Sequence, residues 1–238
     1  MKVKFNRKKP RQPLFSIIYR LAKLPFASKI WKLKLFLNLN WIFWRLSMEQ
    51  AVKLYGFSDE AMRRKNLQLL LSKLDSNSKV MDLGCKYGDI SKIVAEKVKL
   101  IVGIDHDISA LEIAKKENKA DNLKFEYADA FDYLKSNDEN FDVLILSHIL
   151  EHLEKPEELL ANFKEHFTHF YIEVPDFDDT YLNHYRYKVG SSLIYTDDDH
   201  IWEFDRDDFT AILENSGLEI IEAEYRYGLQ KYWCKKKV

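Results

Sequence analysis

The chain has 238 residues, 46% of them hydrophobic and 32% charged, with only seven glycines and five prolines. This composition excludes a collagen-like, low-complexity or compositionally disordered chain, and the length allows one large α/β domain with an appendage. The two cysteines, Cys85 and Cys234, match neither a metal-binding spacing nor a disulfide framework, which excludes a disulfide-built secreted fold.

The net charge of −1 conceals an asymmetry along the chain. Residues 1–79 carry 18 basic and four acidic side chains, which leaves 19 basic and 34 acidic ones for the rest. Within residues 1–46 there are 12 basic residues and no acidic one, interleaved with aromatic and aliphatic side chains. This pattern predicts a basic, aromatic-rich helical arm at residues 1–57, hereafter the basic extension, followed by a main domain at 58–238.

Three interpretations of the basic extension remain open from the sequence. Lys and Arg attract anionic lipids while Trp and Phe enter the headgroup region, so residues 1–46 suit the surface of an anionic membrane. The extension could instead contact nucleic acid, or pack as a helical cap on the main domain. Its longest uncharged run, residues 35–44, is too short to span a bilayer, and no signal-peptide pattern is present. We expect a cytoplasmic protein, peripheral at the inner membrane face.

From residue 58 onward, helix-like and strand-like segments alternate. We predict helices at 58–74, 90–97, 109–118, 156–166 and 207–215. We predict strands at 80–83, 100–104, 123–127, 141–146 and 170–174, and an antiparallel pair formed by 218–228 and 232–234. Such alternation is typical of a doubly wound α/β sheet, whose ligand lies beyond the carboxyl ends of the strands.

A turn with two glycines, Gly84 and Gly88, joins the first predicted strand to its helix. These glycines alone could equally serve close packing of strand and helix. Asp105 ends the second strand 21 residues after Gly84, where a carboxylate can accept both hydroxyls of a ribose. Asp82 precedes the turn and Asp129 ends the third strand. A ring of carboxylates repels a pyrophosphate but attracts a cationic nucleoside, which indicates S-adenosylmethionine as the ligand.

These segments resemble the class I S-adenosylmethionine-dependent methyltransferases, of the type 11/23-like group. Four motifs carry the resemblance, namely VMDLGCKYGD (80–89), GIDHD (103–107), YADA (127–130) and FDVLILSHILEHLEKP (141–156). The resemblance implies a Rossmann-like seven-stranded sheet behind the basic extension. It also implies that Asp82 and the glycine turn hold the methionine end of the cofactor. Asp105 would then bind the ribose hydroxyls, and Asp129 with the Ala130 backbone would bind the adenine. The expected cofactor-binding residues are Asp82, Gly84, Cys85, Gly88, Asp105, His106, Asp129, Ala130 and Ser147.

The chain departs from the family pattern at two places. Lys86 occupies a position where the family usually has glycine, so a Cβ and an ammonium group are expected beside the positively charged donor. The usual Gly-Gly turn before the fifth strand is replaced by residues 166–169. These departures motivate one alternative function, a catalytically degenerate, membrane-associated partner subunit.

The segment after the fourth strand holds the candidate catalytic residues. His148, Glu151 and His152 have the spacing i, i+3, i+4, which predicts one shared face of a helical turn, and His200 is a fourth candidate downstream. This pattern partly resembles the metal-dependent O-methyltransferase branch, which uses ExxEH. A divalent metal held by these four residues would therefore be Mn²⁺, Fe²⁺ or Zn²⁺. Without a metal, His148 or His200 is the expected general base.

Residues 176–200, hereafter the lid, combine acidic and tyrosine side chains. Sugar rings stack on aromatic faces and their hydroxyls bind carboxylates, whereas an acidic surface repels a phosphate chain. The tyrosines could instead pack the lid onto the domain. We predict O-methylation of a sugar hydroxyl on a glycan or lipid-linked saccharide at the membrane surface, in polysaccharide biosynthesis. An RNA 2′-O-methyltransferase that grips RNA with the basic extension is the enzymatic alternative.

Overall fold

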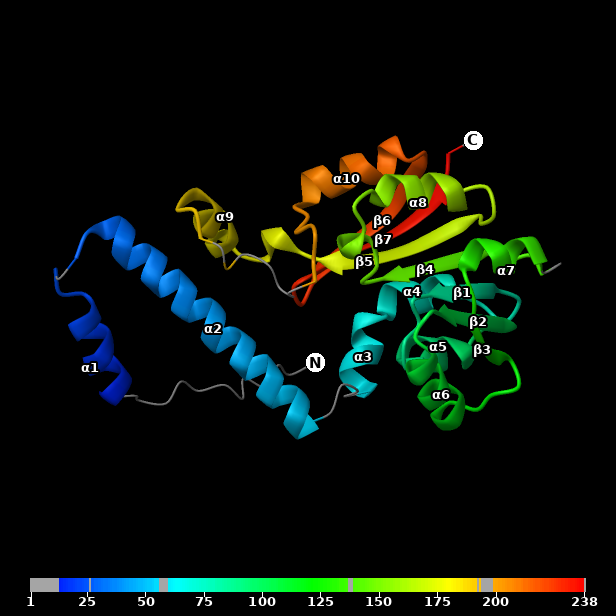
Figure 1. Ribbon diagram of the computed structural model, residues 1–238, viewed down its shortest axis with the longest axis horizontal. Helices are drawn as coiled ribbons and strands as arrows, with labels where there is room; N and C mark the ends of the chain where they lie inside the picture. Colours follow the sequence, from blue (N-terminus) through cyan, green and yellow to red (C-terminus); the bar gives the residue numbers. More distant parts are fainter. Residues whose placement is uncertain are drawn as a thin grey trace, which may run out of the picture.

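The computed structural model describes residues 13–25, 27–55, 60–136, 139–191, 193 and 199–237. At its centre is a seven-stranded sheet with the order β3-β2-β1-β4-β5-β7-β6 (Figure 1). The strands are β1 (Lys79–Leu83), β2 (Leu100–Asp105), β3 (Leu123–Tyr127), β4 (Val143–Ser147), β5 (His169–Pro175), β6 (Leu218–Arg226) and β7 (Leu229–Lys236). The first five are parallel, and β7 runs antiparallel between β5 and β6. The predicted fold class is confirmed.

Helices cover both faces of this sheet (Figure 1). The domain contains α3 (Glu60–Asn66), α4 (Gln68–Lys73), α5 (Asp89–Ala95), α6 (Ile108–Glu117), α7 (Ala130–Ser136), α8 (Pro156–Phe163), α9 (Tyr181–Lys188) and α10 (Arg206–Asn215), with short 3₁₀ helices η1 (Leu150–His152) and η2 (Phe177–Asp179). Phe163 of α8 and Phe209 of α10 are fully buried against one face, and each contributes about 2 kcal/mol of hydrophobic stabilisation. Leu70 of α4 and Val94 of α5 pack on the other face.

The helices of the structure depart from the prediction, because one predicted helix is divided in two and two further helices were not predicted. The single helix expected at 58–74 is broken at Leu67, whose burial at 1% exposure brings it into the same core cluster as Leu70 of α4. The start of that prediction, residues 58–59, lies outside the described residues. Helices α7 and α9 were not predicted, because their sequences have no continuous apolar stripe. Asp129 caps α7 and Thr180 caps α9, so N-cap residues were the available signal.

The basic extension forms two helices, α1 (Pro13–Ala22) and α2 (Lys29–Tyr55), that project to one side of the domain (Figure 1). Lys32 of α2 contacts the segment after α1, because its Nζ donates to the carbonyl oxygen of Leu24 at 3.0 Å. Leu37 of α2 is buried beside α9, whereas α1 buries no side chain within the described part of the chain. Residues 1–12 lie outside the described residues. No helix that the structure describes is both long and apolar enough for a membrane span.

Candidate cofactor and acceptor site

Two features of the turn after β1 require glycine, namely the backbone conformation and the close packing of neighbouring side chains. Gly84 and Gly88 have φ values of 71° and 75°, a region that residues with a Cβ rarely adopt. A Cβ on Gly84 would lie 2.2 Å from Cδ1 of Ile149, and one on Gly88 would lie 2.4 Å from the Phe125 ring. These contacts directly support the interpretation that the two glycines allow close packing of strand and helix. Their expected place at the cofactor stays a prediction.

Lys86 keeps the backbone conformation that a glycine would take at its position. Its φ is 50°, in the left-handed region, which costs a residue with a side chain about 1 kcal/mol. Its backbone N–H donates to Oδ2 of Asp105 at 2.8 Å, so the turn is tied to the end of β2. The departure from the family pattern leaves the turn intact and adds an exposed ammonium group beside it.

Asp105 has lone pairs to offer a ribose. Its carboxylate is 8% exposed and accepts one backbone N–H on each oxygen, from Lys86 and from Asp107, both at 2.8 Å. Each carboxylate oxygen has two acceptor positions, so two remain for ligand hydroxyls. The side chain of His106 is 98% exposed, and its Nδ1 lies 3.9 Å from the same carboxylate.

Two expected cofactor residues direct their side chains into the protein. Asp82 is buried beneath the turn and accepts a hydrogen bond from Oγ of Ser91 at 2.5 Å. Burial raises the pKa of Asp82 to about 7, with the negative charge of Asp105 adding to the effect and the Ser91 hydrogen bond opposing it. The Cys85 thiol is also buried, in a cluster with Phe125, and burial raises its pKa. Of Cys85, the backbone is the part that lines the turn.

The end of β3 lies beside the end of β2, where Tyr127 pairs with Asp105. Oδ1 of Asp129 accepts the backbone N–H groups of Phe131 and Asp132, so the carboxylate caps α7. Ala130 is buried at the start of this helix. Asp82 near the end of β1, Asp105 at the end of β2 and Asp129 after β3 thus lie toward the carboxyl edge of the sheet, with the Asp82 side chain buried. The carboxylates of Asp105 and Asp129 fit S-adenosylmethionine, because they attract its positively charged sulfonium and ammonium groups.

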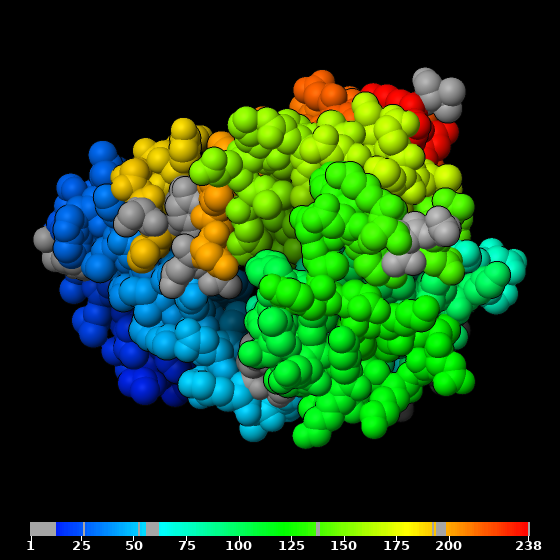
Figure 2. All heavy atoms as spheres, turned by 45° about the vertical axis from the view of Figure 1, so that its right-hand side comes forward, coloured from blue at the N-terminus to red at the C-terminus, as the bar shows by residue number. Residues whose placement is uncertain are grey.

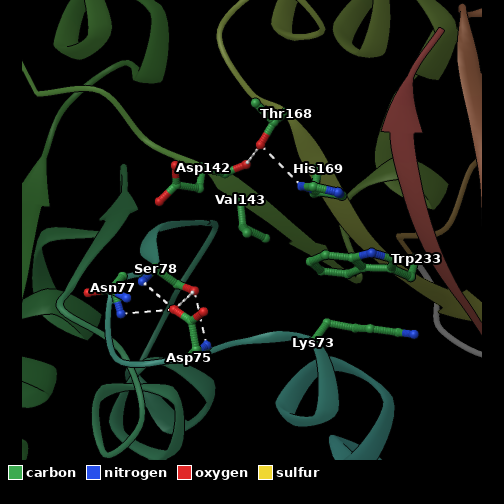
Figure 3. A pocket seen from close by; sticks show the side chains of 9 residues that line it. All are labelled: Lys73, Asp75, Asn77, Ser78, Asp142, Val143, Thr168, His169 and Trp233. Carbon is green, nitrogen blue, oxygen red and sulfur yellow. Dashed lines mark hydrogen bonds between the residues drawn. The ribbon is translucent and has the colours of Figure 1, made fainter.

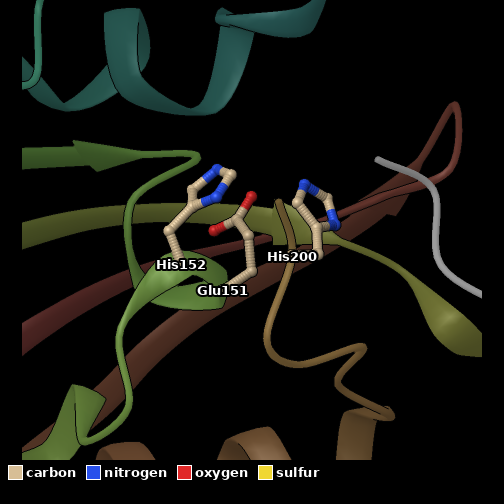
Figure 4. A group of neighbouring side chains, drawn as sticks. All are labelled: Glu151, His152 and His200. Atoms are coloured by element: carbon tan, nitrogen blue, oxygen red, sulfur yellow. The ribbon is translucent and has the colours of Figure 1, made fainter. Parts of the chain in front are cut away.

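A second cluster forms between η1 and the end of the lid. Glu151, His152 and His200 each offer a ligand atom, and these atoms lie within 4.8 Å of one another. Figure 4 shows the Glu151 carboxylate between the two imidazole rings. The backbone carbonyl of Glu151 accepts the N–H groups of Ile201 and Trp202 at 2.9 and 3.1 Å, which holds the His200 segment against η1.

The proton positions in this cluster follow from the partners. Nδ1 of His152 lies 3.2 Å from the carbonyl oxygen of Asp199, which can only accept, so Nδ1 carries the proton and Nε2 is the basic nitrogen. Nδ1 of His200 lies 3.0 Å from Oε1 of Glu203, which directs its proton in the same way. Glu151 is fully buried, and its Oε2 has no hydrogen-bond partner within the described residues. One carboxylate oxygen and two imidazole nitrogens suit Mn²⁺, Fe²⁺ or Zn²⁺.

His148 does not share the helical turn with Glu151 and His152. It precedes η1 with a φ of 56°, so the predicted common helical face was wrong for this residue. Its ring lies between two buried glutamates, with Nδ1 2.9 Å from Oε1 of Glu151 and Nε2 3.6 Å from Oε1 of Glu173. Burial lowers the pKa of His148, but the ring is 43% exposed, and the hydrogen bond and the two negative charges raise that pKa above its ordinary value.

Sequence reasoning missed Glu173, near the end of β5. Its carboxylate accepts hydrogen bonds from Ser147 Oγ at 3.0 Å and from the Tyr171 hydroxyl at 2.8 Å. Ser147, an expected cofactor residue, therefore bonds within the protein. The sequence signal that could have indicated Glu173 is that it is the single acid in the apolar run FYIEVP (170–175). A charge buried in a strand needs partners, so such an acid is a candidate for a site.

Three tyrosines of the lid face solvent. The exposed fractions of Tyr181, Tyr185 and Tyr187 are 83%, 45% and 74%, which argues against a packing role for them. Tyr195 lies outside the described residues. Part of the lid's acidic character is neutralised, because Arg206 donates to Asp176 at 2.6 Å.

A pocket of about 460 Å³ lies at the opposite edge of the sheet, where β1, β4 and β5 begin (Figure 3). Its lining includes Lys73, Asp75, Asp142 and a stacked pair formed by His169 and Trp233, whose ring centroids are 5.0 Å apart. It lies at the amino ends of these strands, whereas the candidate cofactor and acceptor residues follow the carboxyl ends.

Residues 43–223 match the family model described as a methyltransferase domain. The chain belongs to this methyltransferase family. The resemblance to S-adenosylmethionine-dependent methyltransferases is thereby confirmed, and with it, at the level of the family, the expected enzyme class and methyl donor. The matched region begins inside α2, before the domain boundary expected at residue 58, which stays a prediction.

Solved structures share the fold of this methyltransferase domain. A S-adenosylmethionine-dependent methyltransferase from Archaeoglobus fulgidus superposes with a TM-score of 0.57 at 18% identity, covering 79% of this chain and 99% of that one. The magnesium protoporphyrin IX methyltransferase of Synechocystis PCC 6803, solved with bound SAH, gives a TM-score of 0.54 at 15% identity and covers 94% of both chains. Identities this low show the fold alone.

Curated relatives match over shorter stretches. An uncharacterized RNA methyltransferase of Mycoplasma mobile is 33% identical over 85 residues, which are 34% of this chain and 23% of that protein. A ubiquinone biosynthesis O-methyltransferase of Pasteurella multocida is 28% identical over 101 residues, or 38% of this chain and 42% of that protein. The chain thus spans less than half the length of each.

Proposed function

We propose that this methyltransferase domain transfers the methyl group of S-adenosylmethionine to a sugar hydroxyl on a glycan or lipid-linked saccharide at a membrane surface. The observation that carries the proposal is the cluster of Glu151, His152 and His200 at the carboxyl edge of the sheet, next to a lid with exposed tyrosines. When bound, S-adenosylmethionine supplies a methyl group on a positively charged sulfur. The protein must align an acceptor oxygen with it and remove the hydroxyl proton.

His200 is the better base of the two candidates. The raised pKa of His148 keeps its imidazole protonated further into the neutral range, where a protonated ring cannot accept a proton. In His200 the Nδ1 proton is directed to Glu203, so its basic nitrogen is Nε2, within the cluster. His200 would take the hydroxyl proton, while the His148 ring lies between Glu151 and Glu173.

The same cluster supports a metal-assisted version. Glu151, His152 and His200 would hold the ion, which would lower the pKa of an acceptor hydroxyl. Within the described residues the buried Oε2 of Glu151 has no hydrogen-bond partner, which favours this version, because a buried carboxylate oxygen without a donor or cation costs about 1–3 kcal/mol. His148 lies outside the three-residue set, so it is not among the proposed ligands.

An oxygen acceptor is supported by the relative named as an O-methyltransferase. A saccharide is supported by the exposed Tyr181, Tyr185 and Tyr187 of the lid, which offer rings for stacking, and by the acidic balance of the main domain, which disfavours a polyphosphate.

Membrane association is supported by the surface of the basic extension. It exposes many large apolar side chains, namely Leu14, Phe15, Ile17, Ile18, Leu21, Leu24, Ile30, Trp31, Phe36, Ile42, Phe43 and Trp44. Its charged residues up to position 48 are all basic. An anionic leaflet attracts such a surface through both its charge and its apolar boundary region. We therefore propose peripheral association rather than a packed cap.

The test supplies tritiated S-adenosylmethionine and the protein to a membrane fraction of the source cell. Label in material that resists ribonuclease and is released by glycan-cleaving chemistry supports the proposal, whereas ribonuclease-sensitive label supports the RNA 2′-O-methyltransferase alternative, for which one relative is named. Calorimetric titration of the metal-stripped protein with S-adenosylmethionine, with and without Mn²⁺, separates the base-catalysed version from the metal-assisted version. Absence of S-adenosylmethionine binding would leave the degenerate partner subunit.

The matched variants are His200→Ala and His166→Ala. His200→Ala should abolish label transfer while S-adenosylmethionine binding stays within about twofold, because the residue lies on the acceptor side. His166 is exposed and distant from the cluster, so its variant should transfer methyl groups normally. Normal turnover in His200→Ala would overturn the assigned role.

A further inference from the structure

One side of helix α2 is covered by α9 and by the residues directly after it. Nζ of Lys34 donates to the carbonyl oxygen of Gly190 at 2.9 Å. Oδ1 of Asn38 accepts from Oγ of Ser191 at 2.8 Å, and the neighbouring Leu37 is 3% exposed. Figure 2 shows the yellow lid helix beside the blue α2 at one end of the molecule. This side of α2 therefore packs on protein.

The polar side chains in the middle of α2 have partners elsewhere in the chain. Nη2 of the buried Arg186 on α9 donates to Oδ1 of Asn40 at 2.6 Å. Nζ of Lys32 donates to the carbonyl oxygen of Leu24 at 3.0 Å. Tryptophans aside, the polar residues within 31–43 are Lys32, Lys34, Asn38 and Asn40. Each makes a hydrogen bond to another segment, which lowers the cost of placing this stretch in an apolar medium.

The opposite side of α2 is apolar and exposed. Successive residues of an α-helix are rotated by about 100°, so the residues opposite Leu37 follow from the sequence. They include Leu35, Leu39, Ile42, Phe43 and Leu46, hereafter the anchor face. The exposed fractions of Leu39, Ile42, Phe43 and Leu46 are 38%, 39%, 63% and 46%. A contiguous apolar surface of this kind marks an interface, because its contact with water is unfavourable.

The charges around the anchor face favour a lipid leaflet over a second copy of the chain. Residues 35–44 carry no charged side chain, and Lys34 and Arg45 border this run. Long basic side chains can keep their charged ends at lipid phosphates while the apolar residues between them enter the acyl region. A second extension would be equally basic, with 12 basic and no acidic residues in 1–46, so two copies repel each other.

The contact with α9 also attaches α2 to the edge of the sheet that holds the candidate site. Helix α9 follows η2, which in turn follows the end of β5. Nδ2 of Asn183 donates to the carbonyl oxygen of Phe177 at 2.9 Å. Nε2 of His184 lies 2.6 Å from Oδ1 of Asp178. These bonds fasten α9 to η2, and α2 is therefore attached at the carboxyl edge of the sheet.

We propose that α2 is an in-plane membrane anchor, with the anchor face buried in the hydrocarbon of one leaflet and α9 on the aqueous side. At 1.5 Å per residue the anchor face is about 17 Å long, which suits a helix lying within a leaflet. This inference rests on the proposed membrane association and specifies its mode, which is apolar insertion of a defined helix face. It places the carboxyl edge of the sheet on the membrane-attached side, and so favours the lipid-linked saccharide among the proposed acceptors.

Fluorescent labels at two adjacent positions test the assigned face in the full-length protein. Phe43 belongs to the anchor face, whereas Trp44 lies on the α9 side of α2, one turn after Asn40, and both rings are exposed. The variants Phe43→Cys and Trp44→Cys each receive a nitrobenzoxadiazole label. The label selects the introduced thiol, because Cys85 and Cys234 are buried.

The vesicles consist of phosphatidylcholine with about 30% phosphatidylglycerol and a trace of lipid that carries a nitroxide in its acyl chain. The nitroxide should quench the label at position 43 at least about fivefold more strongly than the label at position 44, because only the first enters the hydrocarbon. Equal quenching at the two positions would overturn the assigned face.

Binding measurements separate apolar insertion from adsorption of charge. Phe43→Asn should weaken vesicle binding at least about tenfold and Trp44→Asn less than about twofold, because only Phe43 is buried in the hydrocarbon. Wild-type protein should also sediment with pure phosphatidylcholine vesicles in about 0.5 M NaCl, where the attraction between charges is screened. Binding confined to anionic vesicles at low salt would overturn the apolar anchor and leave membrane association intact. Failure to sediment even with those vesicles would instead overturn the membrane association on which the inference rests.

Discussion

Oε1 of the buried Glu151 lies 2.9 Å from Nδ1 of His148, and this contact couples the charge of the imidazole to a carboxylate inside the candidate acceptor cluster. Glu151 belongs to the three-residue group with His152 and His200, while His148 stands outside it, between Glu151 and Glu173. One carboxylate thereby contacts the His148 ring and belongs to a potential ligand set.

Replacing Glu151 by Gln should lower the pKa of His148. Burial alone lowers this pKa, whereas the hydrogen bond that the His148 ring donates to Glu151 and the charges of Glu173 and Glu151 raise it above the ordinary value. The folded state therefore holds this proton more tightly than the unfolded state. The resulting stabilisation is full below pH 6.5 and is lost as the pH rises through the folded-state pKa. NMR titration of the His148 ring should show the decrease in Glu151→Gln.

The control for that titration is Glu203→Gln. This substitution removes the carboxylate beside His200 and leaves both neighbours of His148 in place. An unchanged His148 pKa in Glu151→Gln, or an equal decrease in both variants, would contradict the assigned cause.

The stability of the protein should fall with rising pH because of Asp82. Burial raises the pKa of Asp82 from 3.8 to about 7, so between these values the unfolded chain releases a proton that the folded chain keeps. The free energy of unfolding should then decrease by up to about 1.4 kcal/mol per pH unit across this window. Asp82→Asn cannot ionise, so urea titrations should show a flatter profile and a variant more stable than wild type at pH 8. If the free energies of unfolding of wild type and Asp82→Asn changed with pH in parallel, Asp82 would be excluded as the source of the pH dependence.

The sheet, its Gly84 turn and the cofactor edge could be predicted because each depends on local pattern: apolar runs, glycine spacing and acids at strand ends. The environment of His148 could not. Its position depends on a left-handed backbone at a residue that is not glycine, and on the β4–β5 pairing that brings Glu173 alongside. The bridge between Arg186 and Asn40 joins residues 146 positions apart, and no spacing rule indicates such a contact.

Lys86→Gly should stabilise the domain relative to Lys86→Ala. Alanine removes the ammonium group but keeps a Cβ at φ 50°, whereas glycine adopts this conformation without the steric cost of about 1 kcal/mol. Urea denaturation of the two variants measures that difference. Both should bind S-adenosylmethionine more tightly than wild type at low salt, because both remove a positive charge beside the donor site. A difference in affinity between them would assign the effect to the backbone.

Gly84→Ala should destabilise the domain for two separable reasons. A Cβ at this position would meet Cδ1 of Ile149 at 2.2 Å, and the φ of 71° disfavours any residue with a side chain. We expect a loss of about 2–3 kcal/mol, within the range for overpacking with added backbone strain. Ile149→Val removes the clashing Cδ1 and alone should cost about 1 kcal/mol.

The double variant Gly84→Ala/Ile149→Val separates the two causes. It should lose less than the sum of the single variants, because the steric conflict is gone and the backbone cost of about 1 kcal/mol remains. Urea denaturation of all four proteins gives the coupling free energy. Strict additivity would show that Ile149 moves aside at no cost and that φ alone requires the glycine. Recovery would instead establish contact with Ile149, the residue between His148 and η1, as the reason why the turn and the catalytic segment pack together.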